Sequence, residues 1–147
     1  MTVWLTQHEA DSLLALEKHY LGSEQYDFPI AGGAIRVPVW SSDHREEFCL
    51  DITGSSVRLE KYTFQNRARK AVILARLDFG GPPHRNPDDE EVPCPHLHLY
   101  KEGYGDKWAL ALPSFFQSLE DPHQLLLEFM DYICIVTKPT IAKGMFP

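Results

Sequence analysis

Alternating hydrophobic and polar residues mark the middle of this chain, between two segments of helical period. Residues 46–53 show the alternation best, because Phe48, Leu50 and Ile52 face one side while the residues between them face the other. Residues 71–79 are the most apolar segment, with both faces hydrophobic over the first half, which is typical of a central strand. The pattern therefore predicts a sheet between two helices.

Two further segments have strand character in the first half of the chain. Residues 35–39 alternate, but Pro38 has no N–H for a ladder, so we expect this strand at an edge of the sheet. A short turn then leads to a predicted strand over residues 57–64, with Val57 and Leu59 facing inward. Both predicted strands belong to the same sheet as residues 46–53.

Glycine and proline divide the second half of the sheet region. Residues 65–70 are polar and predict a connection, and residues 80–95 contain enough glycine and proline to predict a loop. Residues 96–103 predict another short strand. Residues 103–113 predict a glycine-bounded turn followed by a last strand.

The first predicted helix covers residues 5–22. Thr6 and Glu9 form a capping box, in which the hydroxyl and the carboxylate each accept a hydrogen bond from a free backbone N–H. Gly22 is the predicted end of the helix.

The second predicted helix begins at Asp121, an N-cap residue followed by Pro122 at the first helical position. Its broad apolar face consists of Leu125, Leu126, Phe129, Met130 and Ile133. The tail that follows has three residues expected to dock on the body, namely Ile141, Met145 and Phe146. Residues 1–147 are thus expected to form a single α+β domain: an N-terminal helix, a largely antiparallel meander of five to six strands and a C-terminal helix.

Composition narrows the class of protein. A chain of 147 residues with 44% hydrophobic residues can bury one core, and no apolar run is long enough for a membrane helix. The start lacks a secretory signal, and the three widely spaced cysteines favour reduced thiols, so we expect a cytoplasmic protein. The net charge of −7 weakens a nucleic-acid function without excluding it, because basic residues also cluster locally.

Candidate chemistry is concentrated in residues 78–108. His96 and His98 lie two apart, so in a strand both imidazoles leave the same face. Such a pair binds zinc or iron, or serves as acid and base on a phosphodiester. A metal needs a third ligand, for which the candidates are Asp78, His84 and the acidic block of residues 88–91. The competing interpretation is two surface histidines on a half-exposed strand.

The loop before this strand also has candidate binding residues. Prolines stiffen the segment GPPHRNPD around His84 and Arg85, which suits the binding of an anion; the competing interpretation is a surface turn. Cys94 lies between two prolines, and we interpret it as a structural thiol, because the sequence identifies no base for a nucleophile.

The segment YKEGYGDKW combines cationic side chains, rings and glycines. These features suit contact with RNA or a phosphate, although a hairpin that returns its tryptophan to the core explains the same residues. The candidates in and beside this segment are Tyr100, Lys101, Tyr104, Lys107 and Trp108. The basic residues at 67–70 are interpreted as a solvated connection rather than a binding patch.

Residues 74–113, LARLDFGGPPHRNPDDEEVPCPHLHLYKEGYGDKWALALP, resemble the core block of a small family of uncharacterised bacterial and phage proteins. The similarity extends weakly to the flanking strands and the last helix. The family has no established activity, so the resemblance implies no catalytic residue. It implies a cytoplasmic protein from a mobile-element or prophage setting, where toxin–antitoxin ribonucleases and phage inhibitors of host defence are common.

Two functions are compatible with these residues. In the first, the chain is a small nuclease acting on RNA, with His84, His96 and His98 as acid and base. Arg85, Lys101 and Lys107 would stabilise charge, and Tyr100, Tyr104 and Trp108 would stack on bases. No cofactor is required in this hypothesis, but a metal version would use zinc held by His96, His98 and Asp78. It predicts that all these groups meet in one cleft.

In the second, the chain is a non-catalytic module that binds a protein partner, such as an antitoxin-like protein or a phage-type inhibitor of a host complex. The acidic balance, the exposed aromatic residues and the stiff loop favour this function, because they would form a preorganised interface. It predicts a broad surface without a deep pocket. Neither function involves a membrane.

Overall fold

The computed structural model describes residues 4–30, 32–57 and 60–143. Its two helices are α1 (Gln7–Ala15) and α2 (Pro122–Tyr132). The longer strands are β3 (Ala34–Ser41), β4 (Glu47–Gly54), β5 (Tyr62–Ala68), β6 (Val72–Phe79) and β9 (His96–Leu99). The shorter ones are β1 (Lys18–His19), β2 (Tyr26–Asp27), β7 (His84–Arg85), β8 (Glu91–Val92), β10 (Ala109–Ala111), β11 (Ile135–Thr137) and β12 (Ile141–Ala142).

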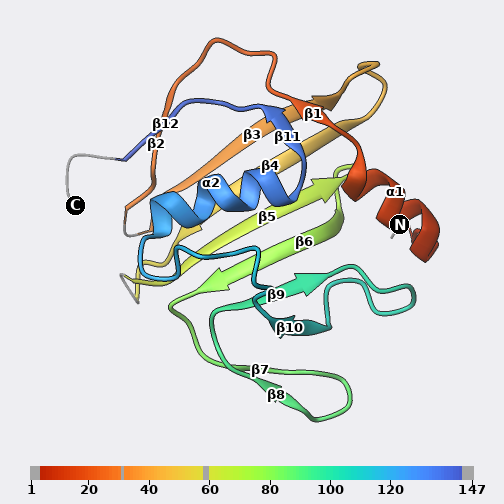
Figure 1. Ribbon diagram of the computed structural model, residues 1–147, viewed down its shortest axis with the longest axis vertical. Coiled ribbons are helices and arrows are strands. Elements are labelled where there is room, and N and C mark those ends of the chain that lie inside the picture. Colours follow the sequence, from red (N-terminus) through yellow and green to blue (C-terminus); the bar gives the residue numbers. More distant parts are fainter. Residues whose placement is uncertain (1–3, 31, 58–59, 144–147) are drawn as a thin grey trace.

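One sheet organises the molecule (Figure 1). Its strand order is β10-β9-β6-β5-β4-β3-β1-β11, and every pair except β1 with β11 is antiparallel. The six strands from β3 to β10 in this sheet form the predicted meander, which confirms the α+β class. Two short strands add to its far edge, so the sheet has eight strands.

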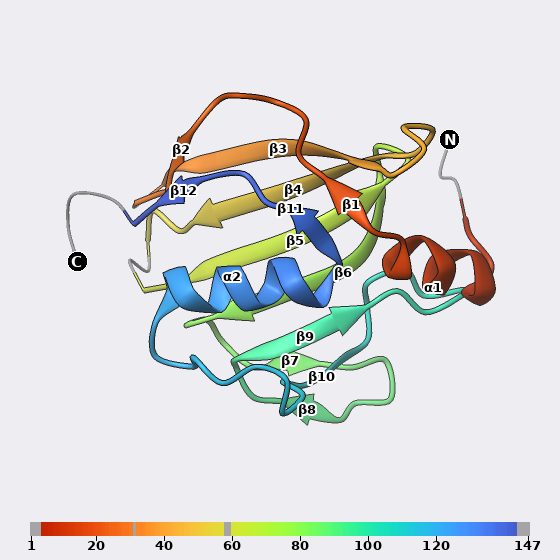
Figure 2. The same cartoon turned by 45° about the horizontal axis from the view of Figure 1, so that its top comes forward.

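Helix α2 lies across one face of this sheet (Figures 1 and 2). Asp121 caps it by accepting a hydrogen bond from the Gln124 N–H, and Pro122 is its first residue, both as predicted. All five residues of its predicted apolar face are fully buried. They pack against the inward residues of the strands, including Phe48, Leu50 and Ile52, so the core lies between α2 and the sheet. Neither helix of the described chain is long and apolar enough to span a membrane.

Helix α1 is shorter than the sequence pattern predicts. The Thr6–Glu9 capping box is present, but the helix ends at Ala15 instead of continuing to Gly22. The reason is tertiary pairing, because Lys18 and His19 join the sheet as β1 between β3 and β11. A gain of sheet hydrogen bonds overrides the weaker helical preference of the local sequence.

The side chain of Lys18 is buried and fixes this junction. Its ammonium group donates to the carbonyls of Leu14, Leu16 and Ile133 at 2.8, 2.9 and 2.8 Å. These bonds use all three N–H donors of the group. The last turn of α1 and the end of α2 are therefore held by one buried cation.

The strand predicted over residues 57–64 begins later. Strand β5 starts at Tyr62, and Val57 is 88% exposed, so it does not face inward; Leu59 lies outside the described residues. The polar segment at residues 65–70 is largely strand, because Gln65 and Arg67 sit on the solvent face of β5. Polar side chains on an uncovered face are compatible with a strand.

Two remaining predictions concern an edge and the tail. Strand β1 pairs with β3 only at its end, so the rest of β3, including Pro38, is an edge of the described sheet, as expected. Ile141 is buried in β12, which pairs with β2. Met145 and Phe146 lie outside the described residues.

Candidate functional site

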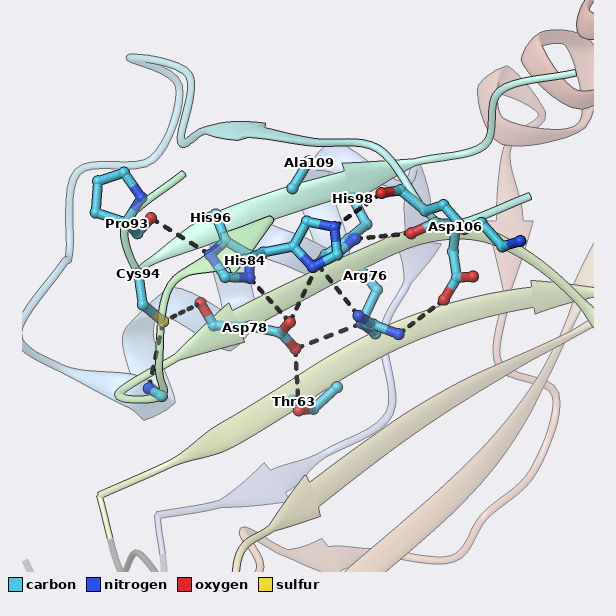
Figure 3. A network of polar contacts seen from close by, with 12 residues as sticks. Thr63, Arg76, Asp78, His84, Pro93, Cys94, His96, His98, Asp106 and Ala109 are labelled. Atoms are coloured by element: carbon cyan, nitrogen blue, oxygen red, sulfur yellow. Dashed lines mark hydrogen bonds and ion pairs between the residues drawn. The ribbon is translucent and has the colours of Figure 1, made fainter. Parts of the chain in front are cut away.

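The face of the sheet opposite α2 has a cluster of polar side chains on β6 and β9. Alternation directs Arg76 and Asp78 away from the core, and the register places them opposite His98 and His96, respectively. His96 and His98 share one face, as the sequence predicts, while Leu97 between them is fully buried on the other side. Figure 3 shows the resulting group of side chains.

The carboxylate of Asp78 is the centre of the cluster. Its Oδ2 lies 3.1 Å from His96 Nε2 and 3.2 Å from His98 Nε2. Its Oδ1 accepts a hydrogen bond from the Thr63 hydroxyl at 3.1 Å and lies 3.5 Å from Arg76 Nε. Burial alone would raise the pKa of Asp78, but the hydrogen bonds from both histidines and the charge of Arg76 hold that pKa well below its usual range. The group therefore carries a negative charge.

The backbone fixes the outer nitrogen of each imidazole. His98 Nδ1 lies 2.7 Å from the carbonyl oxygen of Asp106, and His96 Nδ1 lies 3.3 Å from that of Pro93. A neutral imidazole has one N–H, so each ring can donate either to its backbone carbonyl or to the carboxylate of Asp78. With the proton on Nδ1, both Nε2 lone pairs face that carboxylate, an arrangement that requires a cation between them.

This geometry fits a small divalent metal. Two ligand atoms that each lie about 2.1 Å from a metal are roughly 3.0 Å apart at an octahedral angle and roughly 3.4 Å apart at a tetrahedral one. The two nitrogen-to-oxygen distances around Asp78 fall between these values, and the three donors lie within 4.8 Å of one another. Imidazoles that bind metals also commonly donate their second N–H to a backbone carbonyl, and both Nδ1 atoms face such a carbonyl here.

A guanidinium group competes with a metal for this position. Arg76 Nη2 lies 3.1 Å from His98 Nε2, and Nη1 donates to the carboxylate of Asp106 at 2.7 Å. Its side chain is 25% exposed, and its contact with Asp106 does not depend on His98. Metal binding therefore requires Arg76 to give up its contact with His98.

His84 joins the other two histidines through the predicted loop, which contains the short β7–β8 hairpin. Its ring centre is 4.5 Å from that of His98 and 5.9 Å from that of His96. Its Nε2 donates to the carbonyl of Lys107 at 2.8 Å. The side chain of Asn86 pairs with both backbone groups of Ala109, at 2.9 and 2.8 Å, and so docks the hairpin on β10.

Other predicted binding residues do not reach this cluster. Arg85 donates to the Asp89 carbonyl and to the carboxylate of Glu91. The cation of the loop is therefore paired with the acidic block inside the hairpin. Lys101 Nζ lies 4.1 Å from the ring centre of Trp108, and Tyr104 meets the same ring edge-on. These last three residues contact one another, but Trp108 is half-buried and lies outside the core, so the hairpin interpretation, which returned this ring to the core, is correct only for the turn.

Two residues in the segment have structural contacts instead. The ring of Tyr100 is only 6% exposed, and its hydroxyl donates to the Leu5 carbonyl at 2.6 Å and accepts from the Leu5 N–H. This ring offers no face to a base, so the expected stacking role is wrong. For Lys107, the structure shows a backbone contact with His84. Cys94 follows the structural interpretation, since its thiol donates to the Asp78 carbonyl and accepts from the Gly81 N–H.

Sequence reasoning missed three members of the cluster: Thr63, Arg76 and Asp106. Arg76 had a usable signal, because it shares a strand face with Asp78. Thr63 comes from β5, whose start was misplaced. Asp106 comes from the glycine-bounded turn, where alternation gives no direction.

A second carboxylate-centred cluster lies on the same face, on β4 and β5. The carboxylate of Asp51 accepts from Arg67 Nε and Nη2, from Gln65 Nε2 at 2.8 Å and from the Cys49 thiol at 3.2 Å. Burial alone would raise the pKa of Asp51, but the hydrogen bonds from Arg67 and Gln65 lower it below its ordinary value. Sequence analysis did not single out this cluster.

Comparison with known proteins places the chain in a family. No curated protein and no solved structure matches it. A model described as a family of unknown function (DUF6978) matches residues 5–135, which include the whole Asp78 cluster. The match agrees with the sequence resemblance to an uncharacterised family. The chain belongs to this family of unknown function.

Proposed function

We propose that the chain is a metal-dependent nuclease acting on RNA, in which Asp78, His96 and His98 bind one divalent cation such as Zn²⁺. One observation carries the proposal: two imidazole Nε2 atoms lie within 3.2 Å of one carboxylate oxygen while both Nδ1 atoms face backbone carbonyls. Side chains of this composition and burial are the ligands that catalytic zinc and iron sites use.

The burial of His96 and His98 favours a metal over direct acid–base catalysis. Their side chains are 2% and 0% exposed, so neither ring is open to contact an RNA phosphate. Asp78 is 16% exposed and faces the solvent side of the sheet. A bound cation would supply a Lewis acid and an activated water at this partly open position.

The remaining residues have defined roles in this proposal. His84 is less buried and keeps its Nδ1 lone pair, because Nε2–H is used by the Lys107 carbonyl. It is therefore the ring suited to accept or donate a proton beside the metal. Arg76, once withdrawn from His98, remains beside Asp78 as a fixed positive charge that stabilises the developing charge of a phosphorane.

The test is metal analysis combined with an RNA cleavage assay. Protein purified without chelators is expected to contain stoichiometric metal by inductively coupled plasma mass spectrometry and to cut a labelled single-stranded RNA. His96→Gln combined with His98→Gln should remove both metal and cleavage, whereas His84→Gln should keep the metal and lose cleavage. His8→Gln, at an exposed position on α1, is the matched control. Folded wild-type protein that binds no metal under any loading condition would disprove the proposal.

A protein-binding module is the second candidate, and the docked hairpin favours it. His84 and Asn86 fix the β7–β8 hairpin to the body, so the hairpin presents a preorganised surface. The ring of Phe115, which is 49% exposed, is an aromatic side chain that a partner could contact. The partner would be an antitoxin-like protein or a host complex in the cytoplasm, in a mobile-element setting. Under this function the double histidine variant keeps its partner in a pull-down and the metal has no effect.

A further inference from the structure

The solvent face of β3, β4 and β5 is hollowed by three adjoining cavities. The first, of about 370 Å³, extends from β3 to the turn between β5 and β6. The second, of about 190 Å³, shares Arg36 and Arg67 with it. The third, of about 360 Å³, shares Thr53 with the second and ends near Lys61. We call this continuous depression the sheet groove.

The sheet groove is locally basic in an acidic protein. Its charged lining residues are five cations, Arg36, Lys61, Arg67, Arg69 and Lys70, and three carboxylates, Glu46, Glu47 and Asp51. The chain as a whole has a net charge of −7. A basic depression on an acidic surface focuses the field on an anionic ligand.

Several of these cations are free to contact a ligand. The side chain of Arg36 is 79% exposed, and its nearest carboxylate oxygen, on Asp51, is 4.0 Å away. Lys61 and Lys70 form no ion pair within the described part of the chain. By contrast, the guanidinium of Arg67 is paired with Asp51, and that of Arg69 with Glu46 at 3.2 Å. The unpaired cations lie at both ends of the groove.

The turn at one end holds two cations in an unusual backbone conformation. Arg69 and Lys70 have φ values of 49° and 70°, in the left-handed region. Three residues, Arg69 to Ala71, connect the paired Ala68 and Val72, and positive φ values are easiest for Gly and Asn, so other side chains are strained there. Strain that is maintained for two adjacent basic residues points to a role in binding.

The groove also leads to the candidate metal site. Thr63 lines the third cavity, and its hydroxyl donates to the carboxylate of Asp78. Arg67, which lines the first cavity, lies four residues further along the same strand, or roughly 13 Å away. A linear ligand along β5 would therefore reach Asp78 with one end while contacting the basic cavity with the other.

We propose that the sheet groove binds the phosphodiester backbone of single-stranded RNA and leads it to the Asp78 cluster. This inference rests on the proposed nuclease function and names the surface that holds its substrate. The polar lining favours RNA over a protein partner, because five cations, four hydroxyls and one amide stand against three carboxylates and Phe48 is the one aromatic ring that lines the three cavities. Contacts of this kind read the backbone and carry little base specificity.

The test is RNA binding by fluorescence anisotropy in the presence of EDTA, which prevents metal-dependent cleavage. The probe is a labelled single-stranded oligoribonucleotide of mixed sequence. Arg36→Glu combined with Lys70→Glu is expected to weaken binding at least about tenfold. Replacing both by Gln should reduce the slope of log affinity against log salt by about 1.4, or about 0.7 per cation. Both side chains are exposed, so the fold is expected to persist, and circular dichroism checks this.

The matched control is Lys138→Glu combined with Lys143→Glu. It changes the net charge equally, but Lys138 pairs with Asp131 of α2, and Lys143 follows Ile141, whose carbonyl contacts His123 of α2. Both positions are thus on the helix side of the molecule. This control should bind RNA like the wild type.

The outcomes separate this inference from the proposed function. RNA binding that depends on the groove without any cleavage would support the groove and disprove the nuclease. Cleavage that the groove variants leave unchanged would overturn the groove and keep the nuclease. Absence of RNA binding in all variants, together with a stoichiometric protein partner that is lost from the groove variant, would assign the surface to that partner and overturn the inference.

Discussion

The two carboxylate-centred clusters on the solvent face of the sheet differ in what surrounds them. Asp51 accepts two hydrogen bonds from one guanidinium, that of Arg67, and a third from Gln65. Asp78 instead faces two imidazoles and a guanidinium whose closest contact to it is 3.5 Å. The first carboxylate is saturated by a permanent cation. The second carboxylate also faces two imidazoles, which are side chains that bind metals.

This difference separates a structural ion pair from a site that can exchange its cation. A paired guanidinium cannot lose its charge, so removing its partner leaves an uncompensated cation. An imidazole can lose its proton or present its lone pair to a metal. We therefore infer that Asp51 serves stability and Asp78 serves binding, although the two lie on neighbouring strand pairs of one sheet.

The largest expected effect is the loss of stability in Asp51→Asn. This change leaves the half-buried Arg67 without its carboxylate and is expected to lower the free energy of unfolding by about 3–5 kcal/mol. Asp78→Asn should cost less, about 1–3 kcal/mol, because the asparagine oxygen still accepts hydrogen bonds from Thr63 and an imidazole N–H, and Arg76 keeps Asp106. Urea denaturation of both variants, without metal, measures this. Equal costs for the two substitutions would remove the distinction between the clusters.

The pH dependence of the Asp51 contribution should be the next largest effect. The pKa of Asp51 is lowered in the folded protein below its ordinary 3.8, so the unfolded chain takes up a proton first as the pH falls. The stabilisation is therefore fully present above about pH 5 and is lost as the pH falls below about 4. The difference in unfolding free energy between wild type and Asp51→Asn should shrink over this range. A difference that stays constant down to pH 3 would contradict the assignment.

Removal of the competing guanidinium should sharpen the contrast in metal binding. Arg76→Met takes away the cation that contacts His98 Nε2, so the affinity for Zn²⁺ is expected to rise about tenfold, equivalent to about 1.4 kcal/mol. Arg67→Met is the matched change beside Asp51, where no imidazole is in contact with the carboxylate, and it should create no zinc site. Isothermal titration calorimetry distinguishes the two. Weaker zinc binding in Arg76→Met would show that Arg76 supports the site.

The smallest expected effect is on the reactivity of Cys49. Burial and the hydrogen bond to Asp51 raise the pKa of this thiol to about 11, so roughly one molecule in a thousand carries the thiolate at pH 8. Iodoacetamide should therefore modify Cys49 slowly in the wild type and several-fold faster in Asp51→Asn. Cys134 serves as the internal control for unfolding, and mass spectrometry of peptides gives both rates. An equal increase at both cysteines would indicate unfolding instead of a local change.

Several parts of this arrangement follow from sequence alone, because they depend on period-two alternation within strands. Alternation predicted that His96 and His98 share a face, and Asp78, at the end of the preceding strand, was one of the candidate third ligands together with His84 and residues 88–91. The same rule failed for Tyr100, which follows the last residue of β9 and turns its hydroxyl to Leu5. Alternation holds only as far as the strand does.

The residues of the Asp78 cluster and of the sheet groove that could not be predicted from the sequence are brought together by pairing between distant segments. Thr63 reaches Asp78 through the register of β5 with β6, which shifts at a bulge after Asn66. Arg36 and Lys70 line one cavity because β3 and the β5–β6 turn flank β4. A local pattern contains no information about register or strand order, so these neighbours become visible only in the fold.

The buried ammonium of Lys18 has a consequence for how the protein is made on the ribosome. One of its three acceptors is the carbonyl of Ile133, 115 residues away, and β1 pairs with β11 in the same region. A nascent chain without residues 133–137 would lack one carbonyl acceptor of this cation and would leave one side of β1 unpaired. We expect such shortened chains to be cut by proteases between α1 and β3. The segment after α1 should therefore become protected only when the last strands have been synthesised.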